Sequence, residues 1–183
     1  MEAAHHSPPQ RSPVLVRPER PADRQAIYEV ERLAFGRNAE ADLVERLRVA
    51  CPEGLAFVAE CDAGIVGHVL FTPVEIGSPD VRLRGMGLGP VGVLPDFQRQ
   101  GIGTRLIEEG LETLRRAEVP WVVVLGDRAY YGRFGFQAAS RFHIGCEFDG
   151  VPAEAFMAII WKPEALVGAS GVARYHPEFH TVA

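Results

Sequence analysis

The chain has 183 residues, 47% of them apolar and 23% charged, which is the composition of a globular protein long enough to bury a core. Its formal net charge is −5 and its arginines are scattered, which disfavours nucleic-acid binding because phosphates require a basic face. No apolar run is long enough to span a membrane and the N-terminus lacks a hydrophobic signal segment, so we expect a cytoplasmic protein without a membrane partner.

The N-terminal half is predicted to begin with a disordered tail over residues 1–13, which is rich in proline, histidine and serine. Hydrophobic periodicity then predicts one strand, two helices and three strands, over residues 14–17, 21–35, 41–49, 55–60, 65–71 and 86–93. Ahead of the last of these strands, residues 77–84 are expected to form a polar loop.

The C-terminal half is predicted to continue with a helix, a buried strand, a short helix and a late strand. Apolar residues recur at helical spacing from Ile102 to Leu114, and Val119-Pro120 stops the helix. The buried strand begins at Trp121, and the apolar run 155–161 is expected to pair inside the sheet. The order of elements is β-α-α-β-β-β-α-β-α-β within one domain over residues 14–183.

Residues 88–104 pass from an apolar strand through a glycine-containing turn into a helix. Such a junction can hold a phosphate, because N–H groups of the turn and of the first helical turn point at the anion. Gly101 and Gly103 can adopt positive φ and let an anion approach the backbone closely. Taken alone, the loop fits an ordinary strand–turn–helix junction equally well.

Two familiar phosphate sites do not fit this loop. The only lysine is Lys162, so the Gly-Lys-Ser/Thr sequence of a Walker A loop is absent. A dinucleotide fingerprint needs a third glycine at the position of Leu106. The pattern that remains is Gln98-x-x-Gly101-x-Gly103 after a Val-x-Pro strand end.

A second motif, Gly-Asp-Arg-Ala-Tyr-Tyr-Gly-Arg-Phe-Gly-Phe, follows the buried strand at residues 126–136. In this order and separation the two motifs resemble the GNAT superfamily of N-acetyltransferases, and the second is similar to its YhbS-type branch. The resemblance extends from about residue 14 to the C-terminus and is strongest over 86–136. It implies a layered α/β (α+β) fold in which helices flank a mixed sheet with a splayed central strand. Arg128 replaces a proline that is usual in the branch.

The resemblance also implies the transfer of an acetyl group from acetyl-CoA to a primary amine, by direct attack in a ternary complex. Val91 and Val93 would line the pantetheine arm, with the Val93 amide stabilising the oxyanion, and Gly89-Pro90 supports an interrupted ladder here. The pyrophosphate would be held by the loop residues Gln98, Arg99, Gln100, Gly101, Ile102, Gly103 and Thr104.

Tyr131 is the expected general acid, which would protonate the CoA thiolate as it leaves. The alternative is a tyrosine that packs on the cofactor without transferring a proton. Tyr130, Phe134 and Phe136 are interpreted as core or wall residues. Arg133 reaches a CoA phosphate or lies in solvent, and the sequence does not decide between these two.

The general base is left open by the sequence. Glu31, Glu75 and Asp127 are carboxylate candidates, although an aspartate ahead of a short helix is more often an N-cap. His68 and His143 titrate in a useful range, but lone histidines on strands are more often structural.

The acceptor is expected between residues 36–42 and 142–152, whose polar side chains predict a polar pocket: Arg37, Glu40, Asp42, His143 and Glu147. Small amines, amino sugars and peptides or proteins all stay open as acceptors, and so does a homodimer. A non-catalytic acyl-CoA-binding module and a module for another nucleotide are the alternative functions. No metal site is predicted, and Cys51, Cys61 and Cys146 are interpreted as reduced core residues.

Overall fold

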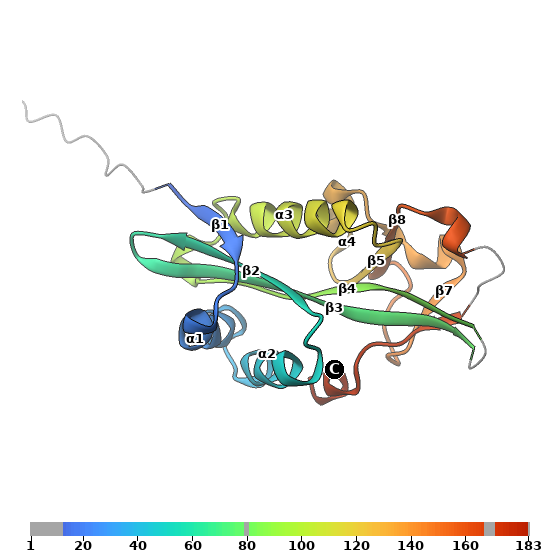
Figure 1. The fold of residues 1–183 in the computed structure, drawn as a ribbon, viewed down its shortest axis with the longest axis horizontal. Coiled ribbons are helices and arrows are strands. Elements are labelled where there is room, and N and C mark those ends of the chain that lie inside the picture. Colours follow the sequence, from blue (N-terminus) through green and yellow to red (C-terminus); the bar gives the residue numbers. More distant parts are fainter. Residues whose placement is uncertain (1–12, 79–80, 167–170, 183) are drawn as a thin grey trace, which may run out of the picture.

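A computed structural model describes residues 13–78, 81–166 and 171–182. Figure 1 shows a long twisted sheet with helices on both of its faces. The tail predicted at residues 1–13 lies, except for Pro13, outside the described residues. None of the described helices combines the length and the apolar character that a membrane span requires.

The main sheet has seven strands in the order β1-β2-β3-β4-β5-β8-β6. Only β4 and β5 pair in parallel, so the sheet is mixed, as predicted. The strands are β1 (Leu15–Pro18), β2 (Leu55–Cys61), β3 (Gly64–Ser78), β4 (Val81–Val93), β5 (Trp121–Leu125), β6 (Gln137–Ala138) and β8 (Phe156–Ile160). A separate parallel pair is formed by β7 (Ile144–Cys146) and β9 (Gly171–Ala173).

Helices α1 (Arg24–Phe35) and α2 (Ala39–Ala50) cover one face of the sheet, and α3 (Ile102–Arg116) covers the other (Figure 1). The short α4 (Arg128–Tyr131) follows β5 on the α3 side. A glycine in the left-handed conformation, Gly36 at φ 69°, ends α1 where the sequence predicted a break.

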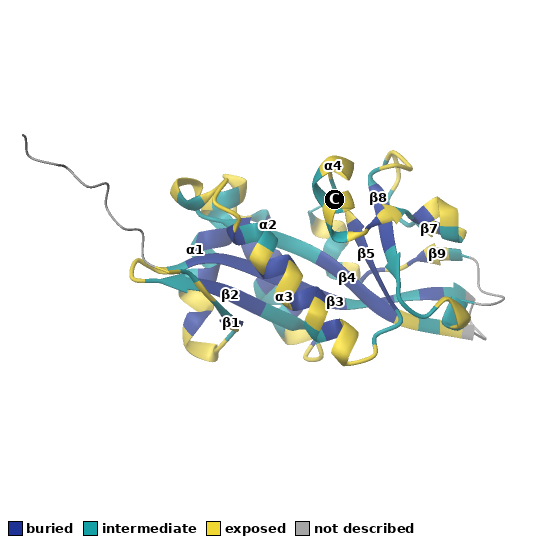
Figure 2. Cartoon of the chain, turned by 90° about the horizontal axis from the view of Figure 1, so that it is seen from above, coloured by how far each residue is buried: buried dark blue, intermediate teal, exposed yellow. Residues whose placement is uncertain are grey.

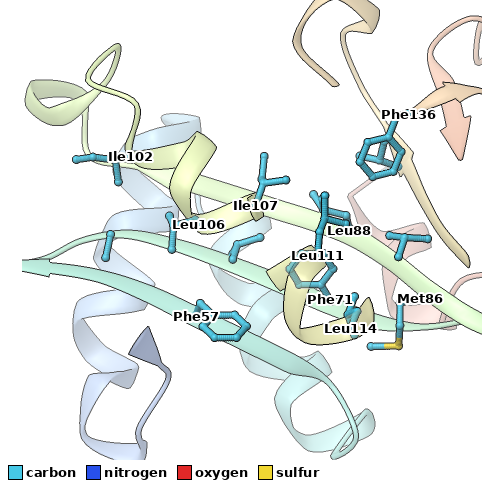
Figure 3. Close-up of a cluster of buried hydrophobic side chains, with 14 of the residues drawn as sticks. Phe57, Phe71, Met86, Leu88, Ile102, Leu106, Ile107, Leu111, Leu114 and Phe136 are labelled. Carbon is cyan, nitrogen blue, oxygen red and sulfur yellow. The ribbon is translucent and has the colours of Figure 1, made fainter. Parts of the chain in front are cut away.

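The amphipathic helix α3 buries one face on the sheet and leaves the other in solvent (Figure 2). Its buried side chains pack on Phe57, Phe71 and Leu88, as Figure 3 shows: Ile102, Leu106, Ile107, Leu111 and Leu114. Each buried aliphatic side chain contributes roughly 1.5–3 kcal/mol. This packing fixes the position of the N-terminus of α3 against the ends of β3 and β4.

The central strand β4 keeps its pairing with β3 up to Val93 but pairs with β5 only over Met86–Leu88. The interruption falls at Gly89-Pro90, where the sequence predicted it, and Pro90 has no N–H to donate. The β3–β4 register also shifts between Val69 and Phe71. β4 and β5 therefore diverge, and backbone groups of 91–93 that face away from β3 have no strand partner.

The polar loop predicted at residues 77–84 is wrong. Its described residues belong to β3 and β4, which continue as one long hairpin with Gly77 opposite Arg82. Polar side chains suggested a loop, but the exposed Arg82 and Arg84 alternate with the partly buried Leu83 along this strand. The short strands β6, β7 and β9 were not predicted either, because strands of two or three residues carry almost no periodic signal.

Candidate functional site

A cavity of about 810 Å³ lies where β4 and β5 diverge. Its walls come from the end of β4, the following loop, the start of α3, and α4. Predicted site residues that line it include Val91, Val93, Gln98, Gly101, Gly103 and Tyr131. Segments about 40 residues apart in sequence, the two predicted motifs, thus meet in one site.

The loop between β4 and α3 is tied to the strand that precedes it. The side-chain amide of Gln98 donates a hydrogen bond to the Val93 carbonyl, with an N···O distance of 3.0 Å. Arg99 and Gly101 both adopt positive φ, at 58° and 80°. The chain therefore turns sharply into α3, whose first N–H groups have no partner within the helix and face the cavity end.

The two loop glycines serve different purposes. Gly101 has positive φ, as predicted. Gly103 does not use that conformational freedom, since it lies inside α3. A Cβ atom at Gly103 would come within 2.9 Å of the Tyr130 hydroxyl, so a side chain there would have to displace that hydroxyl.

Of the predicted loop residues, Gln100 alone does not line the cavity. Arg99, Ile102 and Thr104 line it with Gln98 and the two glycines. The Gln100 side chain instead donates to the Asp96 carbonyl at 3.0 Å.

Tyr131 is held at the cavity by the residues around α4. Asp127 caps α4 by accepting from the Tyr130 N–H at 2.7 Å, as the N-cap interpretation predicted. The Tyr131 ring lies so close to Gly126 that a Cβ atom there would be 2.4 Å from Cε2. The edge of Phe136 packs against the same ring. Burial raises the pKa of Tyr131 to about 12, so its hydroxyl is protonated at neutral pH.

Arg133 lines the cavity with its guanidinium over the Tyr130 ring, at 4.6 Å from the ring centre. It also donates to the Tyr130 carbonyl at 3.2 Å. Tyr130 and Phe97 are lining residues that the sequence interpretation did not assign to the site. Their signal was their place inside the two motifs, where Tyr130 was interpreted as core or wall and Phe97 was given no role.

A second cavity, of about 470 Å³, meets the first at Phe35, Val91 and Tyr131. The segments 36–42 and 142–152 both reach it, as predicted, through Glu40, Phe148, Asp149 and Val151. Its polar character was predicted wrongly. Only Glu40 of the five predicted polar residues lines it, and most of its wall is aromatic or aliphatic.

The proposed bases are scattered over the fold. Asp127 lines the first cavity, whereas Glu31, Glu75, His68 and His143 line neither cavity. Glu75 pairs with Arg82 on the hairpin, and His143 is an exposed residue with φ 58°. Within the described ranges, no cluster of three or more histidine, cysteine, aspartate or glutamate side chains is arranged to hold a metal ion.

Glu31 and His68 form a buried pair between α1 and β3, with 2.6 Å between Oε1 and Nδ1. Glu19 lies 3.6 Å from the other ring nitrogen of His68. Burial acts to lower the pKa of His68, but the two carboxylates outweigh it and raise that pKa. The second Glu31 oxygen has no hydrogen-bond partner among the described residues, and it lies against Gly92 of β4.

The three cysteines pack in the hydrophobic clusters, as predicted, and none of them lines either cavity. All three are free thiols. Burial raises the pKa of Cys51 and of Cys146. Thiols held in this way are poor nucleophiles at neutral pH.

Comparison with known proteins agrees with this geometry. Residues 16–139 match the family model of the acetyltransferase (GNAT) domain. The uncharacterized N-acetyltransferase YhbS of Escherichia coli strain K12 is 36% identical over 168 residues, which is 91% of this chain and 99% of YhbS. YjhQ, another uncharacterized N-acetyltransferase of the same strain, is 39% identical over 122 residues, which is 63% of this chain and 65% of YjhQ.

Two solved structures extend the comparison. The crystal structure of YhbS from Escherichia coli in complex with CoA superposes with a TM-score of 0.85 at 34% identity, covering 98% of each chain. A GNAT family acetyltransferase from Brucella melitensis, in complex with acetyl-CoA, gives a TM-score of 0.74 at 36% identity, covering 92% of this chain and 99% of the other. With this family model, these identities and this fold, the chain belongs to the GNAT family of acetyltransferases.

Proposed function

We propose that this protein transfers the acetyl group of acetyl-CoA to a primary amine by direct attack within a ternary complex. The observation that carries the proposal is the cavity between β4 and β5, which joins an anion-binding helix N-terminus to a buried tyrosine. The CoA and acetyl-CoA complexes of the two related structures support acetyl-CoA as the cosubstrate.

The pyrophosphate of acetyl-CoA is assigned to the Gln98–Thr104 loop. Backbone N–H groups there and the positive end of α3 favour an anion. The guanidinium of Arg133 at the cavity wall adds a positive charge for a phosphate. The pantetheine arm then runs along Val91 and Val93, where β4 has lost its β5 partner.

In the reaction, the ammonium group of the acceptor first releases a proton to solvent. The amine nitrogen then bonds to the thioester carbonyl carbon, and the carbonyl oxygen becomes an oxyanion. The Val93 N–H is assigned to stabilise that oxyanion. When the C–S bond breaks, the nitrogen loses its second proton and the CoA sulfur gains one. The products are the N-acetylated amine and CoA with a free thiol.

Tyr131 is assigned as the hydrogen-bond donor to the departing sulfur. Its pKa of about 12 keeps the proton on the phenol until the sulfur becomes basic. A thiol has an ordinary pKa of about 8.5, so complete transfer from Tyr131 to a free thiolate is uphill by about 5 kcal/mol. We therefore place the proton transfer in concert with C–S cleavage, when the charge on the sulfur is only partly developed.

The experiment that tests the proposal follows acetyl-CoA consumption across amines, amino sugars and lysine peptides, with acetylated products identified by mass. Turnover of one acceptor class is the expected outcome. Saturable acetyl-CoA binding without any acetylated product would instead favour a non-catalytic acyl-CoA-binding module. Equal affinity for ADP, ATP and CoA would favour a site for another nucleotide.

Three further proposals concern the domain organisation, the cellular location and the oligomeric state of the protein. Residues 14–183 are proposed to act as one domain, the protein is proposed to work in the cytoplasm, and a homodimer is proposed as an assembly to test. Limited proteolysis, cell fractionation and light scattering address them in turn.

A further inference from the structure

The second cavity differs from the first in the chemistry of its wall. Aromatic rings form much of it: Phe35, Tyr131, Phe148, Tyr175 and Phe179. Aliphatic side chains form most of the rest, among them Leu43, Leu125, Val151 and Val182. A volume of about 470 Å³ with an apolar wall and few polar groups is typical of a small-molecule site.

Two carboxylates, Glu40 and Asp149, are the only charged side chains among the described residues that line this cavity. Glu40 is 8% exposed and pairs with Arg37, whose side chain lies outside the cavity wall. The Asp149 side chain is exposed and makes no ion pair with any described residue. The carboxylate of Asp149 therefore leaves an unpaired negative charge at the wall, which favours a cation over an anion.

The hydroxyl of Tyr175 adds a third constraint. Tyr175 is 8% exposed, and its hydroxyl has no hydrogen-bond partner among the described residues. Besides this hydroxyl, that of Tyr131 and the carboxylates of Glu40 and Asp149, the described side chains of the wall carry no hydrogen-bonding group. An acceptor with many hydroxyl groups would lose its hydrogen bonds to water on entry, at a cost that apolar contacts do not offset.

We propose that the second cavity is the acceptor site and that its acceptor is a small primary amine on an apolar body, aromatic or branched aliphatic. The inference rests on the proposed acetyl transfer, because it assigns the acceptor of that reaction. The ammonium enters past Asp149 and Glu40. The body packs on the aromatic wall, and the nitrogen lies beside Tyr131, which both cavities share.

The first test compares three amines at saturating acetyl-CoA: 2-phenylethylamine, glucosamine and the amide of Nα-acetyl-lysine. We expect kcat/KM for 2-phenylethylamine to be at least about tenfold higher than for glucosamine or the lysine amide. The apolar wall would bind its phenyl group more favourably than the polar groups of the other two amines. Glucosamine or the lysine amide performing equally well would overturn the inference and leave the acetyltransferase proposal standing. Absence of product with every amine would instead count against the acetyltransferase proposal.

The second test fills the cavity. Val151→Trp places a large ring in the wall, and Val49→Trp makes the same change at an 84% exposed position on α2 that lines neither cavity. Val151→Trp is expected to raise the KM for 2-phenylethylamine at least about tenfold and to leave the Kd for acetyl-CoA within about twofold. Val49→Trp should match the parent chain. Equal KM values in the two variants would overturn the inference.

The third test addresses charge. Asp149→Asn is expected to raise the KM for 2-phenylethylamine about threefold to tenfold at low ionic strength, with the effect shrinking as salt is added. Glu109→Gln removes an exposed carboxylate of α3 that lines neither cavity and serves as the control. If Val151→Trp does not fold, as judged by lost acetyl-CoA binding, Val182→Trp at another lining position replaces it.

Discussion

Tyr131 is the residue on which the two cavities converge, and its hydroxyl is the group that the proposed chemistry uses. Removing only that oxygen separates its two roles. As a packing residue, phenylalanine would replace it without loss, because the ring contacts with Phe136 and with the backbone at Gly126 would stay. As a proton donor, Tyr131 could not be replaced by phenylalanine, because no other described lining residue places a proton donor where its hydroxyl lies.

We expect Tyr131→Phe to lower kcat by about 10²- to 10⁴-fold, the usual contribution of a general acid, with the Kd for acetyl-CoA nearly unchanged. Single-turnover kinetics and calorimetric binding measure the two quantities. Tyr28→Phe is the matched control, since the Tyr28 hydroxyl binds Asp42 on α2 and lines neither cavity. An unchanged kcat would remove Tyr131 as the acid and leave the cofactor-packing role.

His68 makes the stability of the fold depend on pH. Its folded pKa is raised above the ordinary value, so the charged ring stabilises the protein fully below about pH 6.5. That stabilisation is lost as the pH rises through the folded pKa. The stabilisation that Glu19 provides has the opposite pH dependence. Burial acts to raise the pKa of Glu19, but hydrogen bonds from His68 and Arg48 outweigh it and lower that pKa. Its contribution is lost as the pH falls below about 4.5.

We therefore expect His68→Gln to lower the free energy of unfolding by about 3 kcal/mol at pH 6, because a buried carboxylate loses its partner. The difference from the parent chain should narrow as the pH is raised to about 9. Urea titrations at several pH values measure it. A difference that is constant with pH would show that folding does not raise the pKa of His68.

At the scale of elements, the junction between β4 and α3 combines a strand end, a left-handed turn and a helix N-terminus in one short stretch. The Gln98 side chain fixes the turn to the Val93 carbonyl, and Gly103 brings Tyr130 of α4 against the first turn of α3. Any side chain at residue 103 must displace the Tyr130 hydroxyl. A carboxylate there would also repel the pyrophosphate.

Gly103→Asp is expected to raise the Kd for acetyl-CoA by at least about tenfold, through crowding and like-charge repulsion. Gly145→Asp is the control, because a Cβ atom at residue 145 on β7 would meet its neighbours only at ordinary van der Waals distances. Isothermal titration gives both constants. Equal affinities would refute the assignment of the loop to the pyrophosphate.

The sequence predicted this junction well because its signals are local. The strand end, the glycines and the periodicity of α3 fall within a single stretch, so no long-range contact was needed to identify them. The same holds for Gly126 and Tyr131 around α4. The extent of the β3–β4 hairpin was missed because pairing across strands, rather than alternation along them, sets where a strand ends.

The second cavity was harder to foresee for a different reason. Its wall combines α1, α2, β4, the segment around Phe148 and the C-terminal turn at Phe179, which are far apart in sequence. The polar residues of 36–42 and 142–152 suggested a polar pocket, but most of them point elsewhere. Arg37 pairs with Glu40, Asp42 accepts from Tyr28, and Glu147 accepts from the Tyr175 N–H.

At the scale of the whole molecule, the two cavities adjoin and can be filled together, and no cysteine lines either. This arrangement suits direct attack rather than a covalent acetyl-enzyme. We expect initial rates at varied acetyl-CoA and amine to give intersecting double-reciprocal lines. Parallel lines, together with an acetylated residue found by mass spectrometry, would show a ping-pong route instead.

The wall that the two cavities share consists of Phe35, Val91 and Tyr131. These three side chains form the described boundary between the two cavities, so the acetyl end of the cosubstrate and the acceptor amine would lie next to each other there. An acyl chain longer than acetyl would extend into the space of the amine. Butyryl-CoA is therefore expected to bind yet to raise the KM for the amine. Occupancy of the acceptor cavity by the amine would in this way also limit the length of the acyl chain that can be transferred.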